Sequence, residues 1–82
     1  MIEVRYLTKG AVAARYTRHP HSVPRAVKDG TFPSATIHLG PASPRWSSAE
    51  LDRWDVLVAA TGDTRLATSQ VLAERASRLQ AA

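Results

Sequence analysis

Residues 18–34, RHPHSVPRAVKDGTFPS, decide how the first half of the chain folds, because they place two prolines inside an otherwise helical pattern. Proline fixes φ and lacks an amide donor, so a helix tolerates it in the first turn and is kinked or broken by it further in. Two starts are therefore open for this helix. Either Ser22 caps it and Pro24 lies in its first turn, or Pro20 opens it and Pro24 bends it.

The helix itself has one apolar side. Val23 and Val27 share a face at i and i+4, whereas Arg25 and Lys28 point away from that face. Gly30 can adopt left-handed dihedrals without strain, so it predicts the end of the helix. The result is a short helix that exposes basic side chains.

Another short helix is expected just before this one. Thr8 is a suitable N-cap, and Val12, Ala13 and Tyr16 form an apolar stripe beyond it. Only a few residues join the two helices, so they must cross at a steep angle. This arrangement is a helix-turn-helix.

A small two-stranded hairpin is predicted next. The alternation in residues 35–39 indicates a half-buried strand, with inward side chains at Ala35, Ile37 and Leu39. Residues 40–44 form a turn or loop by composition. Residues 45–46 form a short return strand, in which Trp46 faces the core.

The second half of the chain is expected to be helical. Residues 47–50 match a capping box, in which Ser47 is the N-cap and Glu50 reaches back to its amide. The helix that follows has a core stripe of Leu51, Trp54 and Val58. Its acidic residues are best explained as a solvated face; they are Glu50, Asp52 and Asp55.

Gly62 ends this helix, and Asp63 or Thr64 can cap a last one. The last helix is expected to carry an exposed Glu74–Arg78 pair and an apolar side formed by Leu72, Ala76 and Leu79. Because this apolar side is thin, two interpretations stay open. The segment is a loosely packed or partly disordered tail, or it is a helix that awaits a partner.

These elements predict an α+β fold of three to four helices and a two-stranded hairpin wing. We divide it into a domain at residues 1–62 and a C-terminal helix or tail at residues 63–82. The chain has no cysteine, which argues against disulfides and a structural zinc site. No apolar run approaches the roughly 20 residues that cross a bilayer, and no signal-peptide pattern is present, so we expect a cytoplasmic protein without a membrane partner.

The net charge of +4 is distributed unevenly. Residues 1–46 carry a formal charge of +5 and residues 47–82 a charge of −1. This asymmetry suggests a polyanion facing the first half, although a solvated surface with a basic bias is the alternative. Catalysis fits poorly, because His19 and His21 match no common metal signature and no nucleophile or phosphate-loop motif is present. We therefore expect no enzyme activity, no cofactor and no metal.

Nucleic-acid binding fits well. The basic helix can enter a major groove, where Arg25 can fork onto guanine, and Arg45 at the tip of the wing suits a narrow minor groove. The remaining polar and basic side chains of these elements can contact base edges or phosphates. The candidate DNA-binding residues are Thr8, Lys9, Arg18, His19, His21, Ser22, Arg25, Lys28, Thr36, His38, Ser43 and Arg45.

The segments RYLTKGAVAARY, HSVPRAVKDGTFP and HLGPASPRWSSAELDRW occur in this order. Together they resemble the phage excisionase and AlpA-like proteins, relatives of the MerR-type winged-helix domains. The matching motifs are Leu7-Thr8, Ala13, residues 28–33, Arg45-Trp46 and Trp54. The resemblance covers roughly residues 5 to 58 and implies a winged helix-turn-helix that reads DNA with its second helix and its hairpin.

The chain departs from that pattern at three positions. Thr17 replaces the usual turn glycine, Arg18 stands where an apolar residue is common, and Pro24 takes a position that is often aromatic. The resemblance implies a recombination directionality factor that binds and bends attachment-site DNA, associates with itself on DNA and works with an integrase. The alternatives are an AlpA-like transcription regulator and an adaptor that binds a protein instead of DNA.

Overall fold

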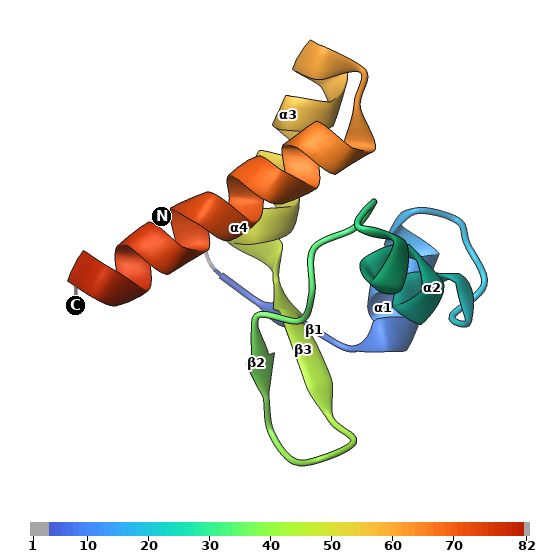
Figure 1. Ribbon diagram of the computed structural model, residues 1–82. Helices are drawn as coiled ribbons and strands as arrows, with labels where there is room; N and C mark the ends of the chain where they lie inside the picture. The colour runs from blue at the N-terminus through green and yellow to red at the C-terminus, as the bar shows by residue number, and fades with distance from the viewer. Residues whose placement is uncertain (1–3, 82) are drawn as a thin grey trace.

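The computed structural model describes residues 4–81 as an α+β fold with four helices and one small antiparallel sheet (Figure 1). The elements in chain order are β1 (Tyr6–Leu7), α1 (Lys9–Arg15), α2 (Ser22–Asp29), β2 (Ile37–His38), β3 (Pro44–Ser47), α3 (Ser48–Thr61) and α4 (Thr64–Ala81). In Figure 1 the hairpin of β2 and β3 projects beside α1 and α2, and α3 and α4 pack together beyond it. None of the helices described in residues 4–81 is long and apolar enough to cross a membrane.

The sheet has three strands in the order β1-β3-β2, whereas the sequence predicts two. The additional strand, β1, pairs Tyr6 with Ser47 and Leu7 with Trp46. Two hydrogen bonds between Arg5 and Ser48 extend this pairing. The Arg5 amide donates to the Ser48 hydroxyl, and the Ser48 amide donates to the Arg5 carbonyl at 2.7 Å. A strand of two residues is too short to show alternation, so its existence depends on partners 39 and 41 positions away.

Helix α1 begins as predicted, because the Thr8 hydroxyl accepts a hydrogen bond from the Ala11 amide at 3.1 Å. It ends in a Schellman motif, in which the Arg18 amide donates to the Ala13 carbonyl at 2.8 Å and the Thr17 amide donates to the Ala14 carbonyl at 3.1 Å. Thr17 has a φ of 55°. The position where glycine is usual therefore does adopt the left-handed conformation, with a threonine in it.

Helix α2 has Pro24 in its first turn, in agreement with the first of the two predicted starts. Ser22 is not its cap, however, because His21 occupies the N-cap position and makes no capping bond with its side chain. The Ser22 hydroxyl donates instead to the carbonyl of His19, which stabilises the turn that leads into the helix. Gly30, with a φ of 79°, ends the helix as expected.

The core lies where the four helices and the sheet meet. Both tryptophans are buried in it, as predicted, together with Val12, Val23 and Leu51. The indole nitrogens are satisfied: Trp46 donates to the Pro33 carbonyl at 2.9 Å, and Trp54 donates to the Thr68 hydroxyl at 3.1 Å. The outer strand β2 is only partly covered. It ends at His38, so the predicted inward position of Leu39 is wrong, and this side chain is 67% exposed.

Residues 64–81 form a helix that packs on α3, but with a different face from the predicted one. Asp63 caps it by accepting from the amides of Arg65 and Leu66 at 3.0 and 3.1 Å. That start sets the phase of the helix so that Ala67 and Val71 are buried and Leu79 is 72% exposed. The expected apolar side is therefore wrong, because cap and packing partner, not the spacing of leucines, decide which face is buried.

Glu50 was expected on a solvated face, yet it is only 7% exposed. Its carboxylate accepts hydrogen bonds from Arg75 at 2.7 Å and Arg78 at 2.6 Å. Arg78 thus pairs with Glu50 and not with Glu74, whose partner is Arg53. These ion pairs join α3 to α4 between residues that are far apart in the sequence. Charge spacing within a single helix does not predict such pairs.

Only one of the two hydrogen bonds of the predicted capping box forms. The Ser47 hydroxyl accepts from the Glu50 amide, but the Ser47 amide donates to the hydroxyl of Thr36 at 3.0 Å. That hydroxyl in turn donates to the Glu50 carboxylate at 2.6 Å. Thr36 therefore completes the cap from another part of the chain.

Candidate nucleic-acid interface

Four of the arginines form ion pairs within the fold. Arg15 on α1 bonds Asp52 and Asp55 of α3 at 2.7 and 2.6 Å, and these contacts raise the pKa of its guanidinium. The other three pairs join α3 and α4: Arg53 with Glu74 at 3.0 Å, and Arg75 and Arg78 with Glu50. The acidic residues of α3 and α4 are thus occupied by internal partners.

Four other cations surround α2. Within residues 4–81, Lys9, Arg18, Arg25 and Lys28 form no ion pair. Lys9 begins α1, Arg18 lies in the turn before α2, and the other two belong to α2 itself. One acidic residue, Asp29, lies on α2 beside these four cations, so this part of the molecule carries net positive charge. Arg45 and Arg65 likewise form no ion pair within residues 4–81.

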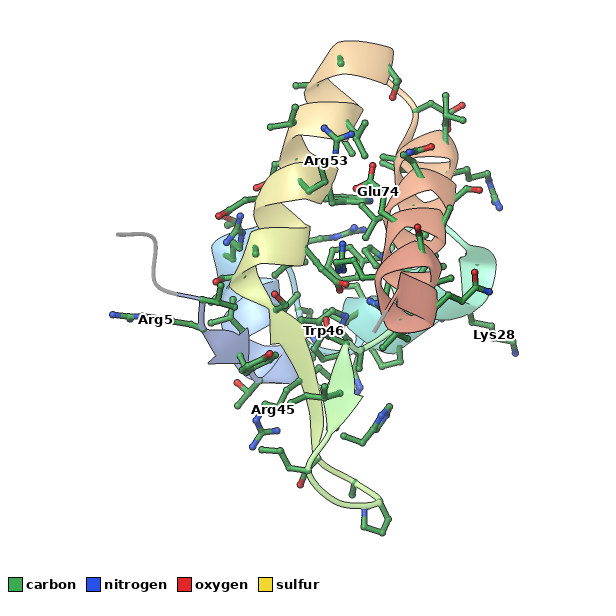
Figure 2. All side chains as sticks on the ribbon, turned by 90° about the vertical axis from the view of Figure 1, so that its left-hand side faces the viewer. Arg5, Lys28, Arg45, Trp46, Arg53 and Glu74 are labelled. Atoms are coloured by element: carbon green, nitrogen blue, oxygen red, sulfur yellow. The ribbon has the colours of Figure 1, made fainter. Side chains whose placement is uncertain are left out.

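The outward face of α2 carries His21, Arg25 and Lys28 at i, i+4 and i+7. All three side chains are exposed, while Val23 and Val27 on the other side pack into the core. Figure 2 shows Lys28 extending away from the body of the molecule. The short helix thus presents an unobstructed polar face.

A groove separates α2 from the hairpin. It has a volume of about 400 Å³ and opens to solvent. Lys9, Lys28 and His38 line it, so residues from α1, α2 and β2 are brought together. Its other lining residues form a largely apolar floor: Pro24, Val27, Ser34, Ala35, Pro44 and Trp46. A groove with an apolar floor and cationic edges can receive one strand of a polyanion.

The turn before α2 holds the remaining residues predicted near this helix. The rings of His19 and His21 stack with centroids 4.8 Å apart, and the His21 amide donates to Nδ1 of His19 at 3.2 Å. Arg18 and Ser22 line a separate cavity of about 70 Å³ above the aromatic core. The described residues contain no group of three or more His, Cys, Asp or Glu side chains that could hold a metal.

Three predicted site residues lie away from this surface or have other bonds. The Thr8 hydroxyl caps α1, and the Thr36 hydroxyl is bonded between Ser47 and Glu50. Arg45 is not at the tip of the hairpin, because the tip is formed by residues 40–43. Figure 2 shows Arg45 and Lys28 on different sides of the molecule.

The alternation of β3 explains the position of Arg45. Pro44 and Trp46 line the groove, so the residue between them points to the opposite face of the sheet. Its guanidinium donates to the Pro44 carbonyl at 2.9 Å. Ser43 remains at the tip, where its amide donates to the Gly40 carbonyl and its carbonyl accepts from Leu39.

Six of the groove residues were not among the predicted site residues: Pro24, Val27, Ser34, Ala35, Pro44 and Trp46. The strand alternation that places Trp46 inward also places Pro44 on the groove side, so Pro44 was predictable from the sequence. Ser34 has no such signal, because its position depends on the path of the chain after α2. The chain matches no protein-family model, no curated protein and no solved structure.

Proposed function

We propose that this protein is a winged helix-turn-helix that binds and bends double-stranded DNA, and that it acts as a phage-type excisionase without chemistry of its own. The observation that carries the DNA-binding part is the charge distribution around α2. Lys9, Arg18, Arg25 and Lys28 are in no ion pair within residues 4–81, whereas the arginines of α3 and α4 that face acidic residues are paired. Long-range attraction of a polyanion would therefore act on the α2 side.

The geometry suggests how the contacts divide. The exposed face of α2 carries His21, Arg25 and Lys28, so it suits a major groove, where Arg25 would donate to a guanine edge. Lys9, Lys28 and His38 would hold the phosphate strand that passes through the groove between α2 and the hairpin. The tip at residues 40–43 would lie over the adjacent minor groove.

The excisionase role rests on the sequence resemblance. It implies cooperative self-association on attachment-site DNA and a contact with an integrase. A single small module buries only about 600–1,000 Å² on DNA, so several protomers would share the cost of bending, which is of order 1–6 kcal/mol for a smooth bend. An AlpA-like regulator would use the same face of α2 but would not need the bend.

A salt titration tests the DNA-binding proposal. We expect about four to six phosphate contacts per protomer, which gives a log–log slope of affinity against salt of about −4 to −5. The combined Lys9→Ala and Lys28→Ala variant should have a slope shallower by about two, since each phosphate contact contributes about 0.9. Arg53→Ala, which removes a charge of the α3–α4 pair, is the control and should leave the slope unchanged.

A flat salt response of the wild-type protein would refute DNA binding and favour the adaptor. Bending separates the other two roles. A circular-permutation assay on a fragment with several attachment sites should show cooperative, bent complexes for an excisionase. Independent occupancy of single, unbent sites would favour the transcription regulator.

A further inference from the structure

The segment of residues 30–36, here called the α2–β2 linker, connects α2 to the hairpin (Figure 1). It contains no helix or strand, so side chains from elsewhere must fix its path. The Trp46 indole provides one contact, to the carbonyl of Pro33 at 2.9 Å. Thr36, the last residue of the linker, is held by Ser47 and Glu50. Helix α4 contributes Arg75, which bonds the linker, and Arg65, which bonds the residue just before it.

Arg75 joins the linker to α3. Its Nη2 donates to the Ser34 carbonyl at 2.8 Å and to the Glu50 carboxylate at 2.7 Å, and its Nη1 donates to the Ser34 hydroxyl and the Ala35 carbonyl at 3.2 and 3.4 Å. The guanidinium is mostly buried, with the side chain 15% exposed. A planar fork with several donors can make all these bonds at once, which an ammonium cannot.

Arg65 acts at the other end of the linker. Its Nη1 donates to the carbonyl of Asp29, the last residue of α2. A cation at this position also interacts favourably with the negative end of the helix dipole. The same nitrogen lies 3.6 Å from the place that a Cβ on Gly30 would occupy, so it sits directly against the turn that ends α2.

We propose that Arg65 and Arg75 are positioning residues that set the orientation of α2 relative to the hairpin, and thereby the specificity of DNA binding. The inference rests on the proposed function, since both elements would contact the same duplex. Helix α4 packs on α3 and buries Ala67 and Val71, while Arg75 reaches the linker and Arg65 reaches the last residue of α2. Helix α4 thus acts on the DNA-binding face without touching DNA.

The test uses two substitutions that keep the core intact. Arg65→Met keeps the length of the side chain and removes its donors, and Arg75→Lys keeps the charge beside Glu50 but loses the fork that spans the Ser34 and Ala35 carbonyls. Arg53→Met is the matched control, because Arg53 of α3 pairs with Glu74 of α4 and, within residues 4–81, forms no hydrogen bond with the linker. Circular dichroism would establish a temperature at which every variant is folded.

Each protein is titrated with a duplex that the wild type has selected from a random library and with a duplex of random sequence. We expect the combined Arg65→Met and Arg75→Lys variant to lose about tenfold in the ratio of the two affinities, equivalent to about 1.4 kcal/mol. Random-sequence binding should change little, because phosphate contacts tolerate reorientation better than base contacts do. Arg53→Met should keep the wild-type ratio.

Amide hydrogen exchange of the free proteins provides a readout without DNA. Exchange in the linker and β2 should accelerate in the combined variant and in Arg65→Met alone. If Arg75→Lys does not fold, the Arg65→Met result tests the proposal. A wild-type affinity ratio together with unchanged exchange would overturn the proposal. If the wild type shows no salt-dependent DNA binding, the proposed function fails, whereas exchange still tests whether the two arginines hold the linker.

Discussion

Replacing Thr17 with glycine should stabilise the protein. Thr17 holds a φ of 55° at the end of α1, and its side chain is exposed. Left-handed dihedrals cost an L-residue roughly 1–2 kcal/mol, and β-branched residues are especially unsuited to them. Glycine removes this cost but adds conformational freedom to the unfolded chain, which opposes the gain by about 0.4–1 kcal/mol.

The net effect of Thr17→Gly is therefore an increase of about 0.5–1 kcal/mol in the free energy of unfolding. For a domain of this size, that increase raises Tm by about 2–8 °C. The Schellman bonds at Ala13 and Ala14 involve backbone atoms, so they survive the substitution. Thermal and urea unfolding, followed by circular dichroism, measure both quantities.

Gly62 offers the reverse substitution. It ends α3 with a φ of 67°, and a Cβ added there would meet nothing within 4 Å. Gly62→Thr should therefore destabilise the protein by backbone strain alone, by an amount similar to the gain from Thr17→Gly. If Thr17→Gly lowers stability while Gly62→Thr behaves as expected, the Thr17 side chain must make a stabilising interaction, and the reasoning from backbone strain is refuted.

Three further outcomes are expected. Trp54→Ala should lower the free energy of unfolding by about 3–5 kcal/mol, because the indole is buried and bonded to Thr68; a variant that unfolds like the wild type would contradict this. Burial favours the neutral acid of Glu50, but hydrogen bonds from Arg75 and Thr36 hold its pKa below the ordinary value. This contribution to stability is complete above the unfolded-state pKa of about 4.3 and is lost as the pH falls through the lower folded-state pKa, so Glu50→Gln should flatten the acid side of a stability–pH profile measured with urea. Arg25→Ala should weaken binding to a selected duplex by about 1–3 kcal/mol and binding to random duplex by less, and equal losses in a gel shift would indicate a phosphate contact.

Features that depend on neighbouring residues were predictable from the sequence. Thr8 caps α1, and Gly30 and Gly62 end their helices, because caps and left-handed turns are decided within a few positions. The buried stripe of Leu51 and Trp54 follows from helical period for the same reason.

Features that depend on distant partners were not predictable. Strand β1 forms because Leu7 meets Trp46, and Glu50 is buried because Arg75 and Arg78 lie on a helix 25 and 28 positions away. The pattern of residues in one sequence predicts the apolar face and the caps of a helix. It does not predict which helix or strand packs against that face. The candidate site shows the same limit: the face of α2 was predicted, whereas the groove with His38 needed the position of the hairpin.

The long-range ion pairs also change the meaning of the net charge. A charge of +4 spread over the whole surface would be a weak indication of any partner. In α3 and α4, Glu74 pairs with Arg53, and Glu50 pairs with both Arg75 and Arg78, so three arginines meet two carboxylates. Around α2, four cations meet one acidic residue of that helix, Asp29, which leaves the larger excess of positive charge there. The proposed attraction of a polyanion would therefore be strongest at the face formed by α2 and the groove beside the hairpin.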